Sequence, residues 1–401
     1  MDVVQNITSI FTADLLKSSM GSLGTSNMVV APYFMIPIIV LAYIGTKHPN
    51  NLSDKSYSSK NLIYLDNLTD TGFQHKYNIS LREIAKSKSA KVLNKLFVSN
   101  KRQLLHYVET TARRIGFEVN YIDMTYKIMT KQLIEGHLRE NGWHVDKRNN
   151  IIPSLSNDTI ILLNAAVFNG DWKYPFDIKY HKWIRFWTEE YRYKLVEGMH
   201  FEAVFPYAEY CDMQLVMVPY NEKHNNLALM IVLPNTVLGL NQILNQLEKH
   251  QNLILHTQFD DKNVNVDVPI FELEEKQLVT DILYKMCLGG LFRSNAILDN
   301  FLDSGKPIPI DQIDHTILLT VNGTITSPED VRRHCPQQTE HVIDFEVNRP
   351  FLFYILDINT RIPFFSGLVT DFSKETGIIN HSEEFQQKKN HISTSNCKKL
   401  E

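Results

Sequence analysis

Cysteine is scarce in this chain of 401 residues, and its four cysteines stand far apart. They are Cys211, Cys287, Cys335 and Cys397, and no two of them form a CxxC pair. Small secreted domains that depend on disulfides carry cysteine at a much higher density. The pattern therefore argues against a disulfide framework and favours reduced thiols in the cytosol.

A large excess of charge of one sign is also missing. Lysine and arginine together number 41 against 45 aspartates and glutamates, so the net charge is −4. This balance gives no electrostatic reason to expect nucleic acid or an anionic membrane as a partner. Hydrophobic residues make up 43% of the chain, which suffices for a sizeable core and excludes global disorder.

No secretory leader is recognisable near the start, where Asp2 takes the place of the usual positive charge. We therefore expect a cytoplasmic protein, and unconventional secretion stays open. The segment 27–46 carries no charge and is nearly long enough to cross a bilayer. Pro32 and Pro37 interrupt it, which favours a strand followed by a buried helix that begins near Pro37. No membrane association is expected.

Familiar catalytic motifs are absent: the sequence has no GxSxG, GxxxxGK[ST], HExxH or strand-linked GxGxxG. His334 and Cys335 are adjacent in a polar segment, but the residues around them supply no partners for a metal or a nucleophile. We therefore expect a protein that is not an enzyme and that holds neither a metal nor a cofactor.

Helix and strand patterns alternate along most of the chain. Apolar residues at helical spacing mark the segments 104–115, 240–247 and 278–286. Short apolar or alternating runs predict strands at 160–163, 227–233 and 264–268. Because no Gly/Ser-rich linker interrupts this alternation, residues 1–372 are predicted to form a single α+β domain. Residues 373–401 are polar and are predicted to be a disordered tail.

Residues Asn322 to Asp344 form a long polar stretch between two apolar segments. Thr316–Val321 before it and Phe351–Leu356 after it both predict buried strands. A connection of this length within a compact domain usually carries function or is disordered. The stretch is the first candidate for a functional site.

Residues 164–177, which read NAAVFNGDWKYPFD, resemble the serpin family's strand motif NAIYFKGxWxxxFD. Asn164, Phe168, Gly170, Trp172 and Phe176 fall on motif positions. Further segments resemble other serpin motifs in the family's order, namely 27–32 with 41–45, 218–220 with 229–234, 268–274, 348–355 and 363–369. The resemblance therefore covers nearly the whole of the predicted domain.

The resemblance implies a serpin fold with three β-sheets, about eight or nine helices and an exposed reactive-centre loop. It implies a monomer whose partner is a serine or cysteine protease. Because no secretory leader is recognisable, the sequence most resembles intracellular members and viral members of the poxvirus type, which modulate host proteases. Asn164 and His315 match the polar residues of the family's central-sheet "shutter". Two serines that follow the first strand in the family are replaced here by Ala31 and Phe34.

In inhibitory serpins the cleaved loop enters the central sheet as a new middle strand, and this requires a hinge of small residues. A gapless match to the family places Gly323 at the hinge Glu and Thr326 at the hinge Thr. The same match places Pro328, Glu329 and Asp330 on the stretch that is normally small. Candidate scissile positions are the Thr339–Glu340 bond of this match and the basic residues Arg332, Arg333 and His334.

A middle strand bonds to neighbours on both sides, and Pro328 has no N–H to offer. Alternation of side chains would bury either Asp330, Arg332 and His334 or Glu329 and Arg333. We therefore predict a serpin with poor loop insertion that acts as a binding, decoy or substrate-like protein. The alternative is an active inhibitor of a trypsin-like protease that recognises Arg332 or Arg333.

Overall fold

The computed structural model describes residues 4–5, 8–9, 11–13, 15–16, 26–45, 68–140, 160–174, 182–221, 226–278, 301–302, 310–323 and 342–372. The chain divides into two compact units. The first comprises residues 1–7, 31–168 and 274–318, and the second comprises residues 8–30, 169–273 and 319–401. Whether residues 1–372 fold as a single domain stays a prediction.

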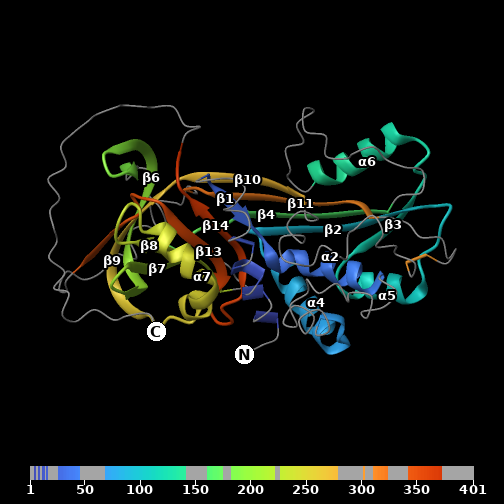
Figure 1. The fold of residues 1–401 in the computed structure, drawn as a ribbon, viewed down its shortest axis with the longest axis horizontal. Coiled ribbons are helices and arrows are strands. Elements are labelled where there is room, and N and C mark those ends of the chain that lie inside the picture. Colours follow the sequence, from blue (N-terminus) through green and yellow to red (C-terminus); the bar gives the residue numbers. More distant parts are fainter. Residues whose placement is uncertain are drawn as a thin grey trace. The chain divides into compact units, whose positions relative to one another are not determined.

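The second unit contains a nine-stranded sheet (Figure 1). Its strands are β1 (Met28–Val30), β5 (Lys182–Glu189), β6 (Arg192–Glu209), β7 (Met213–Pro219), β8 (Leu227–Pro234), β9 (Asp260–Pro269), β12 (Ile343–Glu346), β13 (Phe351–Asp357) and β14 (Pro363–Val369). They follow the order β1-β14-β13-β8-β7-β6-β9-β12, and β5 pairs with β6. The strands predicted at 227–233, 264–268 and 351–356 are all present.

The length of β6 explains why the described residues form two sheets and not the expected three. Its first part pairs with β5 and its last residues pair with β7, while β9 follows it from Gly198 to Tyr207. Hydrogen bonding therefore continues without a break across strands that would otherwise belong to separate sheets. A third sheet is not seen in the described part of the chain.

A five-stranded sheet lies mainly in the first unit, in the order β10-β11-β4-β2-β3 (Figure 1). Its strands are β10 (Phe271–Leu278), β11 (Ile310–Val321), β4 (Ile160–Asn169), β2 (Ala90–Ser99) and β3 (Glu118–Ile122). β2 pairs with β4 in antiparallel register, which sets Asn94 opposite Asn164. The strands predicted from 160 and from 316 are thus both in this sheet.

Besides helical residues between positions 4 and 16, the described helices are α2 (Pro32–Gly45), α4 (Thr71–Ala85), α5 (His106–Arg114), α6 (Lys127–Glu140) and α7 (Leu240–Leu255). The predictions at 104–115 and 240–247 are confirmed by α5 and α7. Gly116 ends the α5 region with a φ of 96°, which suits a residue without a Cβ. The helix predicted from Leu278 is wrong at its start, because Leu278 ends β10; its remainder, and the total of eight or nine helices, lie outside the described residues.

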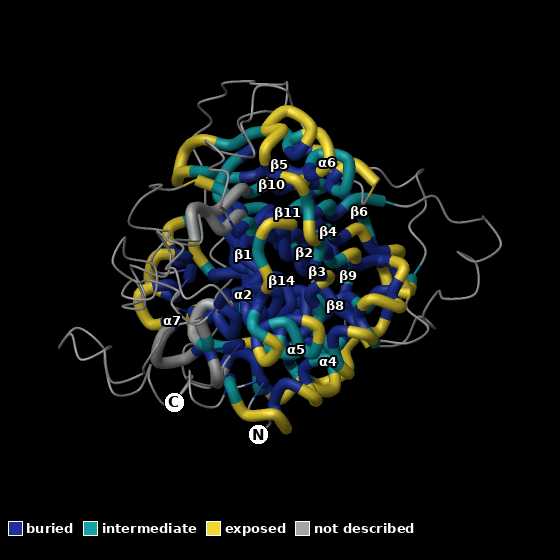
Figure 2. The backbone as a smooth tube through the Cα atoms, turned by 90° about the vertical axis from the view of Figure 1, so that its right-hand side faces the viewer, coloured by how far each residue is buried: buried dark blue, intermediate teal, exposed yellow. Residues whose placement is uncertain are grey.

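The helix predicted to begin near Pro37 begins at Pro32, and Pro37 lies inside it. Pro32 is compatible with the first helical turn, where an N–H has no partner within the helix. All residues from Ala31 to Leu41 are buried (Figure 2). Burial of this apolar segment offsets the cost of an internal proline. None of the described helices is long and apolar enough to span a membrane.

The expectation of reduced thiols is wrong for Cys211, which is disulfide-bonded. Its partner is outside the described residues, as are Cys287, Cys335 and Cys397. Distance along the sequence does not reveal distance in space, and this is why spacing alone missed the bond. The thiol argument for the cytosol therefore fails at this residue, and a cytoplasmic location stays a prediction.

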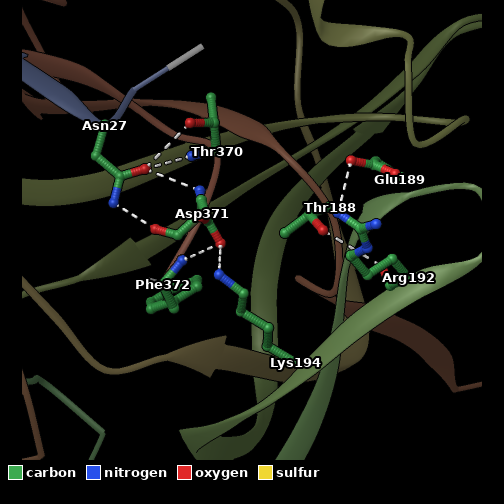
Figure 3. A network of polar contacts seen from close by, with 8 residues as sticks. All are labelled: Asn27, Thr188, Glu189, Arg192, Lys194, Thr370, Asp371 and Phe372. Carbon is green, nitrogen blue, oxygen red and sulfur yellow. Dashed lines mark hydrogen bonds and ion pairs between the residues drawn. The ribbon is translucent and has the colours of Figure 1, made fainter. Parts of the chain in front are cut away.

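The C-terminal end of the described chain is tied to its first strand (Figure 3). Asn27 Oδ1 accepts hydrogen bonds from the amides of Thr370, at 2.6 Å, and Asp371, at 2.9 Å. Lys194 forms an ion pair with Asp371, and the Phe372 ring packs against Phe186 at 4.8 Å between centroids. The last described residues, up to Phe372, are therefore held against β1 and β5, whereas the predicted tail at 373–401 lies outside the described residues.

Candidate functional site

The strands between which a serpin loop would insert are direct neighbours in this chain. β4 and β11 are adjacent and hydrogen-bonded in the five-stranded sheet. The polar stretch predicted as the reactive loop follows directly after β11. No strand intervenes between β4 and β11, so the sheet is in its closed arrangement.

One face of these two strands is buried at every position whose burial the structure describes. On β4 this face carries Leu162, Asn164 and Ala166, which are 0% exposed, and on β11 it carries His315 and Ile317, also 0% exposed. A strand placed between them would present every second side chain to these neighbours.

The opposite face is covered in part. Leu163 and Ala165 of β4 pack there against Ile134 and Leu138 of α6, and Leu318 of β11 is a half-buried member of the same cluster. An inserted strand would therefore meet apolar side chains on both faces.

Asn164 lies at the centre of a buried polar cluster made by Phe34, Asn94, Asn164 and His315. Its Nδ2 donates to the backbone carbonyl of Phe34 at 2.8 Å and to Asn94 Oδ1. Its Oδ1 is bonded to His315 Nδ1. The cluster thus links α2, β2, β4 and β11, the two strands of the insertion position among them.

The hydrogen bonds fix the tautomer of His315. Asn164 Nδ2 is a donor to two oxygens, so Asn164 Oδ1 must be the acceptor and His315 Nδ1 must carry the proton. Burial lowers the pKa of His315 from its usual value of 6.5 to about 3. Its Nε2 is unprotonated and finds no hydrogen-bond partner among the described residues. The histidine is therefore neutral at physiological pH.

The structure brings the two predicted shutter residues, Asn164 and His315, into direct contact. Sequence reasoning missed Asn94 and the Phe34 carbonyl. Asn94 interrupts the apolar strand AKVLNKLFVS, and a lone amide in a buried strand is a signal that could have been used. Every residue has a backbone carbonyl, so the residue type does not indicate which carbonyl accepts such a bond.

The start of the loop is held by Trp172. Its indole Nε1 donates to the backbone carbonyl of Asn322 at 2.8 Å, one residue after β11 ends. The indole is 2% exposed and stacks on Tyr220 at 4.3 Å between ring centroids. Asn322 and Gly323 are themselves half-buried. The predicted hinge therefore starts from a fixed point.

The far end of the loop is fixed by β12. Ile343–Glu346 pairs in parallel with β9, and Asp344 accepts a hydrogen bond from Asn265 at 3.0 Å. Phe345 is buried beneath this pair of strands. Both ends of the candidate loop are thus anchored in sheets.

The other predicted site residues lie outside the described residues and were not placed. They are Thr326, Pro328, Glu329, Asp330, Arg332, Arg333, His334, Thr339 and Glu340. Among the residues that are described, no group of three or more His, Cys, Asp or Glu side chains could hold a metal ion.

A closed central sheet with a polar cluster beneath it, followed by a polar stretch whose two flanking segments are held by described residues, agrees with the arrangement that the serpin motifs imply. The sequence profile of the family "Serpin (serine protease inhibitor)" matches residues 6–372. The match covers more than nine-tenths of the chain, and the chain belongs to the serpin family.

Relatives of similar length support this assignment. Serpin B5 of Rattus norvegicus is 24% identical over 383 residues, covering 92% of this chain and 99% of the relative. Serpin B3 of Homo sapiens is 24% identical over 397 residues, with the same coverage of both chains. The solved structure of maspin has 22% identity and a TM-score of 0.76, covering 92% of this chain and 98% of that one. The similarity in structure establishes the fold.

Proposed function

We propose that this serpin binds proteases, or proteins that recognise its loop, as a decoy or substrate and does not trap them through loop insertion. The observation that carries the proposal is the segment Ser327–Arg333, which reads SPEDVRR and would have to become part of a middle strand. A protease cleaving the loop would then release a nicked serpin and remain active.

The burial of the insertion position supports this proposal. One parity of the inserted strand would place Asp330 and Arg332 against the fully buried face of β4 and β11, and the other would place Glu329 and Arg333 there. A buried, unpaired charge costs several kcal/mol or more. The α6 cluster covers part of the opposite face, so the charged side chains that would point to that face would also be poorly hydrated.

Pro328 adds a backbone cost that does not depend on parity. It has no N–H, so at least one bond to β4 or β11 would be missing, and its ring restricts the residue before it. The missing bond leaves a buried carbonyl without a donor, which costs about 1–3 kcal/mol. Together these costs slow the insertion of the loop. A serpin traps its protease only if insertion is faster than hydrolysis of the acyl-enzyme, so slow insertion favours release of the protease.

We propose a monomer that docks a serine protease of trypsin-like specificity, because Arg332 and Arg333 suit a specificity pocket with a carboxylate at its base. The anchors at Asn322 and at β12 support a loop that is presented for docking while both of its ends stay fixed.

Incubation with trypsin tests the proposal. We expect cleavage at Arg332 or Arg333, no SDS-resistant complex, and a melting temperature of the nicked protein close to that of the intact one. A matched triple variant, Pro328→Ala with Glu329→Ala and Asp330→Ala, keeps both arginines as cleavage sites and removes the proline and the two acidic side chains that oppose insertion. Its melting temperature should rise after nicking. A covalent complex, or a large rise in melting temperature on nicking the unmodified chain, would establish the trapping inhibitor instead.

A further inference from the structure

Helix α2 contains a proline in its interior, and two backbone carbonyls before this proline accept hydrogen bonds from side chains outside the helix. Pro37 is the sixth residue of the helix that begins at Pro32. A helical residue normally donates its N–H to the carbonyl four positions earlier, which for position 37 is the carbonyl of Tyr33. Pro37 has no N–H to donate to that carbonyl, and a proline ring inside a helix crowds the carbonyl four residues earlier.

The Tyr33 carbonyl accepts a hydrogen bond from outside the helix. The donor is the hydroxyl of Tyr77 in α4, at 3.1 Å. The Tyr77 side chain is 0% exposed, and its ring lies 4.9 Å from that of Tyr33. Burial raises the pKa of the Tyr77 hydroxyl, so the group stays protonated and able to donate.

The next carbonyl, that of Phe34, is also used from outside the helix. It accepts from Asn164 Nδ2 at 2.8 Å, at the centre of the buried cluster that joins β2, β4 and β11. Two consecutive carbonyls before Pro37 thus receive side-chain donors from two different elements.

The residue types at this turn explain why a backbone acceptor is needed. Position 31 is alanine and position 34 is phenylalanine, where the serpin motif has serines with hydroxyl groups. The Phe34 side chain is 0% exposed and has no polar atom to offer Asn164. Without another acceptor, one N–H of the buried Asn164 amide would be left unpaired.

We infer that Pro37 is a positioning residue for the closed sheet. By opening the helix at Tyr33 and Phe34, it directs the Phe34 carbonyl to Asn164 and thereby replaces the missing serine hydroxyl. Asn164 then holds β4 against β11 through His315. The inference concerns the intact sheet and does not require any particular fate of the cleaved loop.

Native-state hydrogen exchange of the full-length, intact protein tests this inference. Pro37→Val keeps a similar side-chain volume and restores the N–H, which should bond to Tyr33 and straighten the helix. We expect amides in α2 to exchange more slowly, and amides of β4 and β11 to exchange roughly tenfold faster, the effect of one lost buried hydrogen bond. Pro37→Ala restores the same N–H in less space and guards against overpacking.

Whether exchange in β4 and β11 becomes faster or slower distinguishes a positioning role of Pro37 from a merely structural one. Removing a proline from a helix interior stabilises the helix, so a structural role alone predicts slower or unchanged exchange in β4 and β11. That outcome would overturn the inference. Pro32→Ala is the matched control, since Pro32 occupies the first turn, where no helix bond is gained, and it should leave β4 and β11 unchanged.

A second arm leaves the helix untouched. Asn164→Asp replaces with an oxygen the Nδ2 group that donates to both Phe34 and Asn94, so β4 and β11 should exchange faster although Pro37 is retained. Unchanged exchange would mean that the Phe34 bond does not hold the sheet, and the inference would be wrong even if the Pro37 variants failed to fold. No protease or nicked loop is used, so failure here is distinct from failure of the decoy proposal.

Discussion

His315 couples the closed sheet to pH, because a fully buried imidazole cannot accept a proton without a large cost. Its pKa is about 3 in the folded protein and about 6.5 in an unfolded chain. Between these values the unfolded chain binds a proton that the folded protein does not. Stability is therefore complete above about pH 6.5 and falls as the pH drops towards about 3.

The first prediction follows from this difference. Lowering the pH from about 7 to about 4.5 should remove about 2–3 kcal/mol of unfolding free energy through His315 alone. Urea unfolding of the unmodified protein and of His315→Asn at both pH values measures the contribution, since the asparagine amide nitrogen occupies the position of Nδ1 and can donate to Asn164 but does not titrate. An equal loss in both proteins would show that other groups account for the acid sensitivity.

Among single residues of the site, the sequence indicated those that act through their side chains. Asn164 was found through the motif that contains it, His315 was found as a match to the family's central-sheet residues, and the structure puts the two in contact. The Phe34 carbonyl was not found, because a backbone acceptor is available at every residue and only geometry selects one. Cys211 was misjudged for a similar reason, since pairing depends on proximity after folding.

Two glycines in or next to helices differ in whether their position tolerates a side chain, and this difference gives a prediction at the scale of secondary-structure elements. Gly116, after α5, has a φ of 96°, and a Cβ built there would lie 2.5 Å from Leu81 Cδ2. At Gly136, within α6, the same hypothetical Cβ would have no atom within 4 Å other than those of its chain neighbours and its own helix backbone. The first position requires glycine and the second does not.

The same substitution should therefore have opposite effects at the two sites. Gly116→Ala should lower the free energy of unfolding by about 1–3 kcal/mol through backbone strain. Gly136→Ala should raise it by about 0.5–1 kcal/mol, because alanine is the better helix former. Chemical unfolding of both variants checks the pair, and destabilisation by Gly136→Ala would mean that α6 is constrained by contacts beyond those described.

At this scale, strands were easier to predict than helix boundaries. Apolar runs such as Leu227–Leu233 and Phe351–Leu356 identified central strands, because both faces of such strands are buried. The start of α2 was placed five residues too late, since Pro37 was taken as a boundary. Tertiary burial and donors from Tyr77 and Asn164 compensate for the proline, and local sequence does not report either.

For the whole molecule, the disulfide at Cys211 yields a prediction about the topology of the chain. Peptide mapping without reduction should find Cys211 linked to Cys287, Cys335 or Cys397. Cys211→Ser should lower the free energy of unfolding by about 2–4 kcal/mol in oxidising buffer and have little effect in reducing buffer. A free Cys211 thiol in the mapping would restore the original expectation of reduced cysteines.

The fold as a whole was predictable from ordered motifs, whereas the division of the described strands into two sheets was not. β6 is long enough to pair with β5, β9 and β7, and this continuity merges groups of strands that the family pattern treats separately. Sequence identifies each strand by its own residues, but the partner of each strand depends on twist and register along its whole length.

The pairing of β1 with β14 sets an order of events during synthesis. Met28 lies opposite Leu368, and Asn27 bonds to Thr370 and Asp371. A growing chain therefore cannot close its largest sheet until almost all of the body has left the ribosome. The early apolar segments must wait, exposed or held by chaperones, and amino-acid changes that delay this last pairing should increase aggregation of nascent chains before they affect the finished protein.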